Sequence, residues 1–341
     1  MRTFWNLVRR ALLGALALLA LAVIAGAVWQ AAATRRDRAR FPVSGERVDA
    51  GGFRLHLVPA GLGRPGPTVL LECGIGGATA VTWSWVERGV APFAPVVAYD
   101  RAGMGLSDPG PSPRDGIRMA RELHAALEHA GLPGPYVFVG HSYGGLIARI
   151  FTSAYPRDVA GLVLVESSHP AQFGPGGGGG GRMLRRLRAI GALLPLAPWL
   201  ARIGVMRAVM DWVPTDADLL PAPARDAQRA FMSSSRQWVA IVDELRCWAD
   251  CTNPEARAAG GFGNRPLAVV TAGEHAGWGG GWMRLQAETA ALSTRHEQLV
   301  VPGATHGSVI ADSSHAVRVV GAIRDVVNAC RGAAFPPAAA R

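Results

Sequence analysis

Short apolar runs alternate with amphipathic segments along most of the chain. Runs of four to eight mostly aliphatic residues are typical of strands that are covered on both faces, as in a parallel sheet. The predicted strands are Phe53–Val58, Thr68–Glu72, Val96–Asp100, Tyr136–Gly140, Gly161–Glu166, Leu267–Ala272 and Gln298–Val301. Between them, segments such as Gly116–Ala130 carry apolar residues at helical spacing. The repeated strand–helix order predicts an α/β fold with a doubly wound, mostly parallel sheet.

The alternation stops after Pro170. Gly176–Gly181 is a run of six glycines, and Arg182–Cys251 is then patterned like a series of helices. Strand–helix order resumes at Leu267–Ala272 and closes with a helix around His315–Cys330. We therefore predict one domain over residues 44–331, with a helical lid inserted at about 171–260 and a loose tail at 332–341.

The N-terminus carries a topogenic segment. Three arginines within Met1–Arg10 precede an unbroken apolar run of 19 residues, Ala11–Trp29. A secretory signal core spans about 7–15 residues, whereas a membrane-spanning helix needs about 17–25. The length favours a single-pass membrane anchor at residues 1–30, followed by a polar linker at 31–43. Ala31 and Ala33 keep open a cleavable signal and a secreted protein.

Arginines flank the apolar run on both sides, so charge does not specify the orientation. An extracytoplasmic folded domain is one of the two topologies. The arginines also concentrate charge at the N-terminus: residues 1–43 contain seven arginines and one acid, against a net charge of +10 for all 341 residues. Because no basic stripe interleaved with aromatic residues follows, we expect no nucleic-acid partner.

The cysteines do not indicate a metal or redox site. None of the four, Cys73, Cys247, Cys251 and Cys330, forms a CxxC pair. Cys247 and Cys251 could lie one helical turn apart, either bridged or as two thiols. We expect neither a metal nor a cofactor.

A Gly-x-Ser-x-Gly pattern occupies Gly140–Gly144, directly after a predicted strand and before the helical stretch Leu146–Ala154. In this context the serine sits on a tight, strained turn that projects its hydroxyl above the sheet. Ser142 is therefore a candidate nucleophile, and the Tyr143 backbone N–H a candidate oxyanion donor. The alternative is a glycine-rich structural turn.

From about Val48 to Arg331 the chain resembles the α/β-hydrolase superfamily, in its lid-bearing serine hydrolase branch. The resemblance is carried, in this order, by LLECGIGGA (70–78), AYDRAGMGLSDPG (98–110), GHSYGGLIAR (140–149), LVLVESSHP (162–170) and VPGATHGSVIAD (301–312). This combination is specific for the fold and not for a substrate.

The resemblance implies roles for two further segments. The loop at Cys73–Gly76 occupies the place of the family's His-Gly-x-x-Gly, so the Ile75 N–H is the second oxyanion candidate, although a plain tight turn is the alternative. The base should follow the last strand, where His306 lies. Its rivals are His141, His275, His296 and His315.

The acid is less clear. Relatives often place an aspartate after the seventh strand, but Ala276 falls at that position here. A minority place the acid after the sixth strand, where this chain has Glu166. We favour Glu166, with Glu274 as the alternative.

A serine nucleophile implies acyl transfer through an acyl-enzyme. Four tryptophans of the insertion, Trp199, Trp212, Trp238 and Trp248, point either to an apolar substrate pocket or to the core of the lid. We predict a small-molecule carboxylic ester with an apolar group as substrate. The alternatives are an aminopeptidase or amidase on the same fold, and a non-catalytic binding protein.

Overall fold

The computed structural model describes residues 1–41, 44–174, 185, 189, 191–210, 212–274 and 280–335. The glycine run at 176–181, His275 and Ala276 lie outside the described residues. So do the last two residues of the predicted linker and residues 336–341 of the predicted tail.

Within these residues, eight strands form one sheet in the spatial order β1-β2-β4-β3-β5-β6-β7-β8. The strands are β1 (Glu46–Asp49), β2 (Arg54–Ala60), β3 (Thr68–Glu72), β4 (Val96–Asp100), β5 (Tyr136–His141), β6 (Val159–Val165), β7 (Gly263–Ala272) and β8 (Ser293–Val301). Strand β2 pairs antiparallel with both β1 and β4, and every other neighbouring pair is parallel. The predicted doubly wound, mostly parallel sheet is confirmed.

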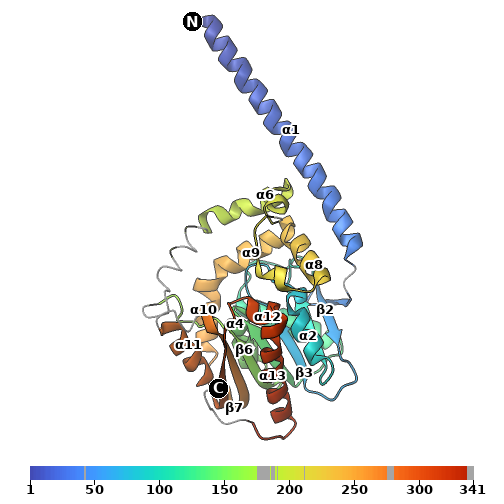
Figure 1. Ribbon diagram of the computed structural model, residues 1–341, viewed down its shortest axis with the longest axis vertical. Helices are drawn as coiled ribbons and strands as arrows, with labels where there is room; N and C mark the ends of the chain where they lie inside the picture. The colour runs from blue at the N-terminus through green and yellow to red at the C-terminus, as the bar shows by residue number, and fades with distance from the viewer. Residues whose placement is uncertain are drawn as a thin grey trace.

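Helices cover both faces of the sheet (Figure 1). Two apolar cores result, because successive residues of a strand point to opposite faces: Leu70 and Phe138 enter one core, and Leu71 and Val139 enter the other. The first core contains side chains from α3 (Gly116–His129), α4 (Gly144–Ala154) and α11 (Gly281–Ala290). The second contains side chains from η1 (Ala80–Trp83), α2 (Ser84–Val90), α12 (Ser308–Ala311) and α13 (Ser313–Cys330).

Between β6 and β7 the chain forms a series of helices, which we call the insertion. Its described elements are η2 (Leu194–Leu196), α6 (Ala197–Arg202), α7 (Val205–Met210), η3 (Asp216–Leu219), α8 (Ala222–Met232), α9 (Ser235–Cys247), the π-helical turn η4 (Trp248–Thr252) and α10 (Asn253–Ala258). The insertion lies over the carboxyl ends of the parallel strands (Figure 1). Gln237 of α9 donates to the Gly77 carbonyl after β3 at 2.6 Å, and Thr252 lies 2.8 Å from the Tyr143 hydroxyl after β5. Cys247 and Cys251 are both free thiols.

One long helix, α1 (Arg2–Arg40), extends away from the sheet domain (Figure 1). Within the described chain, its segment Arg2–Asp37 is the one helix long and apolar enough to cross a membrane. We predicted a linker at 31–43, but α1 continues through Arg40. Residues 31–40 are mostly alanine and arginine, which are strong helix formers, so their polarity did not end the helix.

The C-terminal part of α1 packs against the insertion. The Gln30 side chain donates to the Ser233 carbonyl at 2.7 Å and accepts from Arg207 Nε at 2.9 Å. The same Arg207 forms an ion pair with Asp37 at 2.7 Å. These contacts tie α1 to α7 and to the end of α8.

Candidate active site

Ser142 lies in the turn between β5 and α4. Its φ is +54°, in the left-handed region that L-residues rarely adopt. The flanking glycines are required by space, since a Cβ on Gly140 would lie 2.6 Å from the Gly144 carbonyl oxygen, and one on Gly144 would lie 2.6 Å from the Glu72 carbonyl oxygen. The turn is therefore compressed enough to lift the serine side chain out of the sheet.

The end of β6 holds this turn in place. The Ser142 N–H donates to the Val165 carbonyl at 3.0 Å, and the Ser142 carbonyl accepts from the Ser168 N–H at 2.9 Å. These bonds over-determine a backbone conformation that would otherwise relax.

His306 reaches Ser142 from the loop after β8. Its Nε2 lies 2.9 Å from Ser142 Oγ, and its Nδ1 lies 3.2 Å from Glu166 Oε2. With the proton on Nδ1, the ring donates to the carboxylate and accepts from the serine hydroxyl. The three residues thus form one hydrogen-bonded chain across the carboxyl ends of β5, β6 and β8.

Glu166 directly follows β6 and is completely buried. Its φ is +46°, and its Oε1 accepts from the Ala272 N–H at 2.8 Å and from Trp282 Nε1 at 3.2 Å. These two donors compensate for the loss of solvent around the carboxylate and orient its other oxygen towards His306. Trp282, on α11, could not be identified from sequence because no motif connects it to a residue 116 positions earlier.

Among the described residues, Glu274, His296 and His315 form no hydrogen bond with the side chains of Ser142 or His306. The Glu274 side chain is exposed and forms no hydrogen bond or ion pair with a described residue. His315 contacts Ser308, and His296 contacts the Ser293 carbonyl at 2.7 Å. His275 lies outside the described residues.

His141 supports the site from behind the elbow. Its Nε2 lies 2.8 Å from the His306 carbonyl oxygen and donates to it, which holds the His306 loop against β5. Burial, and then the nearby His306, lower the pKa of His141 to about 3. The imidazole is therefore neutral at ordinary pH and places no positive charge beside the candidate base.

Two backbone N–H groups are available above Ser142. Neither the Tyr143 N–H nor the Ile75 N–H has a hydrogen-bond acceptor among the described residues. The Ile75 loop lies against the elbow so closely that a Cβ on Gly74 would come within 3.2 Å of Ser142 Cβ. Cys73 is buried and its thiol donates to the Thr79 carbonyl at 3.2 Å. Burial raises the pKa of this thiol to about 12, so it remains protonated.

Arg101, which was not predicted as a site residue, holds the loop Cys73–Gly76 together with Glu72 and Glu244. Arg101 follows β4 and is buried. Its guanidinium donates to the Cys73 and Gly74 carbonyls at 2.7 and 2.8 Å, to Glu72 at 2.7 Å, and through two bonds to Glu244 of α9 at 2.7 and 2.8 Å. All five donors of the guanidinium are used. The pairing with two carboxylates raises the pKa of Arg101 further above its usual range, despite burial.

A cavity of about 280 Å³ opens above Ser142. Its floor contains Gly74, Ile75, His141, Ser142 and His306. Its walls combine the apolar Met210, Ala217, Leu220, Met232 and Ile310 with the polar or charged Thr215, Asp216, Gln228 and Arg229. None of the four tryptophans of the insertion contributes to these walls among the described residues. Trp199 and Trp212 are exposed, while Trp238 and Trp248 pack within the insertion and against Tyr143. No group of three or more metal-ligating side chains is found in the described part of the chain.

Comparison with known proteins agrees with this fold. A family model described as "alpha/beta hydrolase fold" matches residues 67–202, which include β3 to β6 and the elbow. An "AB hydrolase superfamily protein" of Gibberella zeae is 40% identical over 106 residues, or 30% of this chain and 33% of that protein. The chain spans only 18%, 33% and 41% of the length of the first three curated relatives that it matches.

Solved structures match over most of the chain. A haloalkane dehalogenase variant from Bradyrhizobium elkanii superposes with a TM-score of 0.61 at 15% identity, covering 85% of this chain and 97% of that one. A thermophilic esterase from Thermogutta terrifontis superposes with a TM-score of 0.58 at 18% identity, covering 84% and 99%. At these identities the likeness shows the fold alone. Together with the family model over residues 67–202, it shows an α/β-hydrolase fold.

Proposed function

We propose that the protein is a serine hydrolase that cleaves a carboxylic ester through an acyl-enzyme, with Ser142 as nucleophile, His306 as general base and Glu166 as the acid of the triad. The observation that carries this proposal is the hydrogen-bonded chain from Ser142 Oγ through both nitrogens of His306 to Glu166. A serine hydroxyl becomes a competent nucleophile at neutral pH when an adjacent base removes its proton.

In the first half-reaction, Ser142 Oγ bonds to the ester carbonyl carbon while its proton passes to His306 Nε2. The charge then developing on the carbonyl oxygen is stabilised by the Tyr143 and Ile75 N–H groups, each worth about 10²–10³ in rate. When the tetrahedral intermediate collapses, the bond to the alkoxy oxygen breaks, and His306 donates its proton to the departing alcohol.

In the second half-reaction, water attacks the acyl-enzyme and gives one proton to His306 Nε2. The bond to Ser142 Oγ then breaks, the serine recovers the proton, and the carboxylic acid leaves. Glu166 keeps the Nδ1 proton in place and stabilises the imidazolium that forms in both halves.

The walls of the cavity support an apolar substrate group. Met210, Leu220, Met232 and Ile310 form an apolar part of the lining, and Asp216 and Arg229 add one charge of each sign elsewhere in it. Dehalogenase and epoxide hydrolase chemistry need a carboxylate as nucleophile, and this chain has a serine there. We propose that the insertion acts as the lid of this cavity.

We further propose that α1 anchors the protein in a membrane as a single span. The apolar run Ala11–Trp29 is exposed along almost its whole length, and the described protein covers it only near Gly26 and Trp29. Such a surface requires a lipid environment.

The proposal is tested by labelling the full-length protein, purified in detergent, with a fluorophosphonate reagent. We expect one modified serine, Ser142, and loss of labelling in Ser142→Ala. Hydrolysis of a panel of esters should fall by up to about 10⁶ in the same variant. Ser112→Ala, a substitution at an exposed serine, is the control and should change neither result. Full activity of purified Ser142→Ala would refute the proposal.

A further inference from the structure

We propose that the insertion carries a membrane-docking surface that lies in the same bilayer that α1 enters, so that a lipid-dissolved ester reaches Ser142 from the membrane. The docking surface consists of Leu193, Leu196, Trp199, Val209, Trp212 and Val213. Its contact with lipid is independent of the chemistry at Ser142, whereas the route of the substrate rests on the function proposed above.

The side chains of the docking surface are exposed. The six side chains all come from residues 193–213, and every one is exposed. Trp199 is 64% exposed and Trp212 is 86% exposed. Soluble proteins rarely leave several large apolar side chains of one segment in water, and tryptophan is enriched where proteins meet the membrane–water interface.

The segment 193–213 contacts α1 at the C-terminal end of its apolar run. Gly26 of α1 lies so close to the Ile203 carbonyl, between α6 and α7, that no Cβ would fit. Trp29 packs beside Gly204 in the same way. Gly26 and Trp29 belong to the last turn of the apolar run, which is long enough to cross a hydrocarbon core at about 28 Å. The junction between α6 and α7 therefore lies at the edge of any bilayer that α1 spans.

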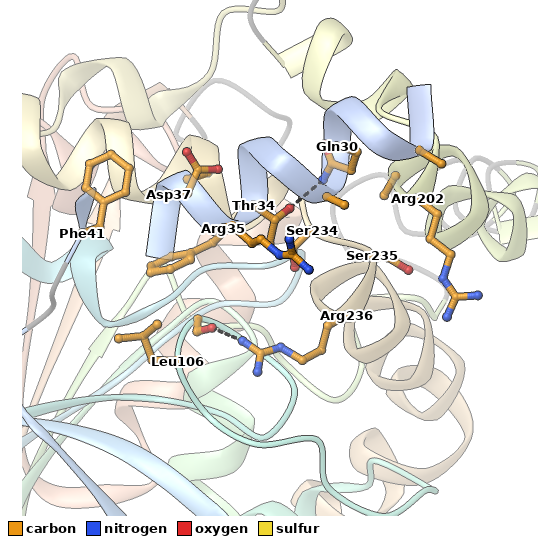
Figure 2. Close-up of a pocket in the computed structure, with 16 residues that line it drawn as sticks. Gln30, Thr34, Arg35, Asp37, Phe41, Leu106, Arg202, Ser234, Ser235 and Arg236 are labelled. Carbon is orange, nitrogen blue, oxygen red and sulfur yellow. Dashed lines mark hydrogen bonds between the residues drawn. The ribbon is translucent and has the colours of Figure 1, made fainter. Parts of the chain in front are cut away.

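The residues that follow this contact along α1 are mostly polar or charged. A cavity of about 520 Å³ lies between α1 and the start of α9, next to Gln30, Thr34 and Asp37 (Figure 2). Arg35, Arg202 and Arg236 line it. Apolar residues up to Trp29 and cationic residues from Arg35 onward match the order of hydrocarbon and headgroup layers. The Arg202 guanidinium also lies over the ring of Trp199, 5.1 Å from its centroid. This contact places a cationic residue of the cavity next to an apolar residue of the docking surface.

The occupant of the docking surface is a lipid bilayer and not a second copy of the chain. The α6–α7 junction contacts the end of the apolar run of α1. Lipid that surrounds this end of the run therefore also contacts the docking surface. Figure 1 shows α6 on the side of the domain towards which α1 extends.

The docking surface is also continuous with the candidate active site. Met210, Asp216, Ala217 and Leu220 line the cavity above Ser142, and the same stretch of chain carries Trp212 and Val213 on its exposed side. An apolar ester that leaves the bilayer at this point passes along one segment to reach the serine. The substrate class that fits is an ester with a long acyl or alkyl chain.

The lipid contact is tested with the full-length protein in phosphatidylcholine vesicles. An environment-sensitive fluorophore is attached at Trp212→Cys, in a background where the partly exposed Cys251 and Cys330 are serine. The control position is Leu62→Cys. Leu62 is 60% exposed, but it follows β2 and precedes β3 at the amino-end edge of the parallel strands, opposite the insertion.

We expect a lipid with a spin label near its headgroup to quench the probe at position 212 and to leave the probe at position 62 unchanged. Equal quenching at both positions, or at neither, would overturn the docking surface. So would a disulfide between two copies at position 212 in unlabelled Trp212→Cys, which would show a second chain as the occupant.

Activity measurements separate the two proposals. In Trp199→Glu/Trp212→Glu, hydrolysis of a long-chain ester dissolved in vesicles should fall by about tenfold or more. Hydrolysis of a short, water-soluble ester should stay unchanged, and Leu62→Glu should affect neither. An equal loss on both esters would refute delivery from the membrane. Quenching at position 212 in a protein with no Ser142-dependent hydrolysis would support the docking surface and refute the proposed function.

Discussion

At the scale of single residues, the candidate site is marked by backbone strain. In the described part of the chain, the non-glycine residues with positive φ are Ser142 and Glu166, at +54° and +46°. Each such conformation costs about 1–3 kcal/mol, and such residues cluster at functional sites. Both lie next to the end of β6. Ser142 donates to the Val165 carbonyl and accepts from the Ser168 N–H, and Glu166 donates to the Val270 carbonyl. The fold therefore applies strain to two of the three residues proposed for the triad.

The choice of acid gives a prediction at this scale. Glu166→Gln keeps an oxygen for the Ala272 N–H but removes the charge that stabilises the imidazolium of His306. We expect kcat to fall by about 10⁴ with KM changed much less, as for other triads that lose their carboxylate. Steady-state kinetics on a short ester measures both constants.

Glu274→Gln is the matched control, since Glu274 is the alternative acid and its exposed side chain forms no hydrogen bond or ion pair with a described residue. It should retain nearly full kcat. If kcat collapses in Glu274→Gln alone, at unchanged stability, Glu274 and not Glu166 is the acid of the triad.

Sequence reasoning identifies these residues only as far as motifs and chain order extend. Ser142 stands in a recognisable turn, and His306 follows the last strand. Glu166 is favoured because the loop after the seventh strand has no aspartate. Trp282, which donates to Glu166, had no such signal, because its role depends on how α11 packs beside β6.

At the scale of elements, Arg101 connects the loop Cys73–Gly76 to α9. Glu244 of α9 binds Arg101, and Arg101 binds the Cys73 and Gly74 carbonyls that precede Ile75. A helix of the insertion thereby positions a loop of the sheet domain. Arg101 and Glu244 are positioning residues, since neither lines the cavity above Ser142.

Glu244→Gln should disturb this connection. The amide nitrogen would face a guanidinium that has only donors to offer, so one of the two bonds is lost. We expect the free energy of unfolding to fall by about 1.5–3 kcal/mol. We also expect kcat to fall by about tenfold to a hundredfold, with little change in KM, because the Ile75 N–H is misplaced for the transition state.

Asp243→Asn provides the comparison on the same helix. Asp243 binds Ser112 at the surface and does not contact Arg101. Thermal unfolding and kinetics of the two variants should differ. Loss of stability without any loss of kcat in Glu244→Gln would mean that the cluster is structural only.

The elements themselves follow closely from the pattern of the sequence. Thr68–Glu72 and Val96–Asp100 are predicted at their observed bounds, because buried parallel strands have a strong apolar signal. The edge strand β1 was not predicted, since its four residues are mostly polar and exposed. The tryptophans of the insertion were ambiguous because apolar residues at helical spacing do not show which face meets the sheet.

At the scale of the whole molecule, α1 and the insertion form one joint. Gly26 sits against the Ile203 carbonyl, and Gln30 and Asp37 continue the contact to Ser233 and Arg207. The sequence contains both halves of this joint, but the residues that bond across it are 170 to 203 positions apart, so no local pattern predicts that they meet.

Gly26→Leu tests the joint. Leucine favours a helix more than glycine does, so any destabilisation must come from the clash with Ile203. We expect this variant to destabilise the packing of α6 and α7 by about 1–3 kcal/mol and to raise amide hydrogen exchange there. Gly14→Leu places the same residue on α1 where nothing lies within 4 Å, and it should leave the exchange unchanged. Equal exchange in both variants would argue against the contact.

The joint between α1 and the insertion has a geometric consequence for catalysis. With α1 spanning a bilayer, a rigid connection at Gly26 and Gln30 fixes the height of Ser142 relative to the membrane plane. Under the proposed function, the preferred substrates would be those whose ester bond can reach the distance from the bilayer at which Ser142 is held. The helix α1 would then set the distance of Ser142 from the membrane as well as attach the protein to it.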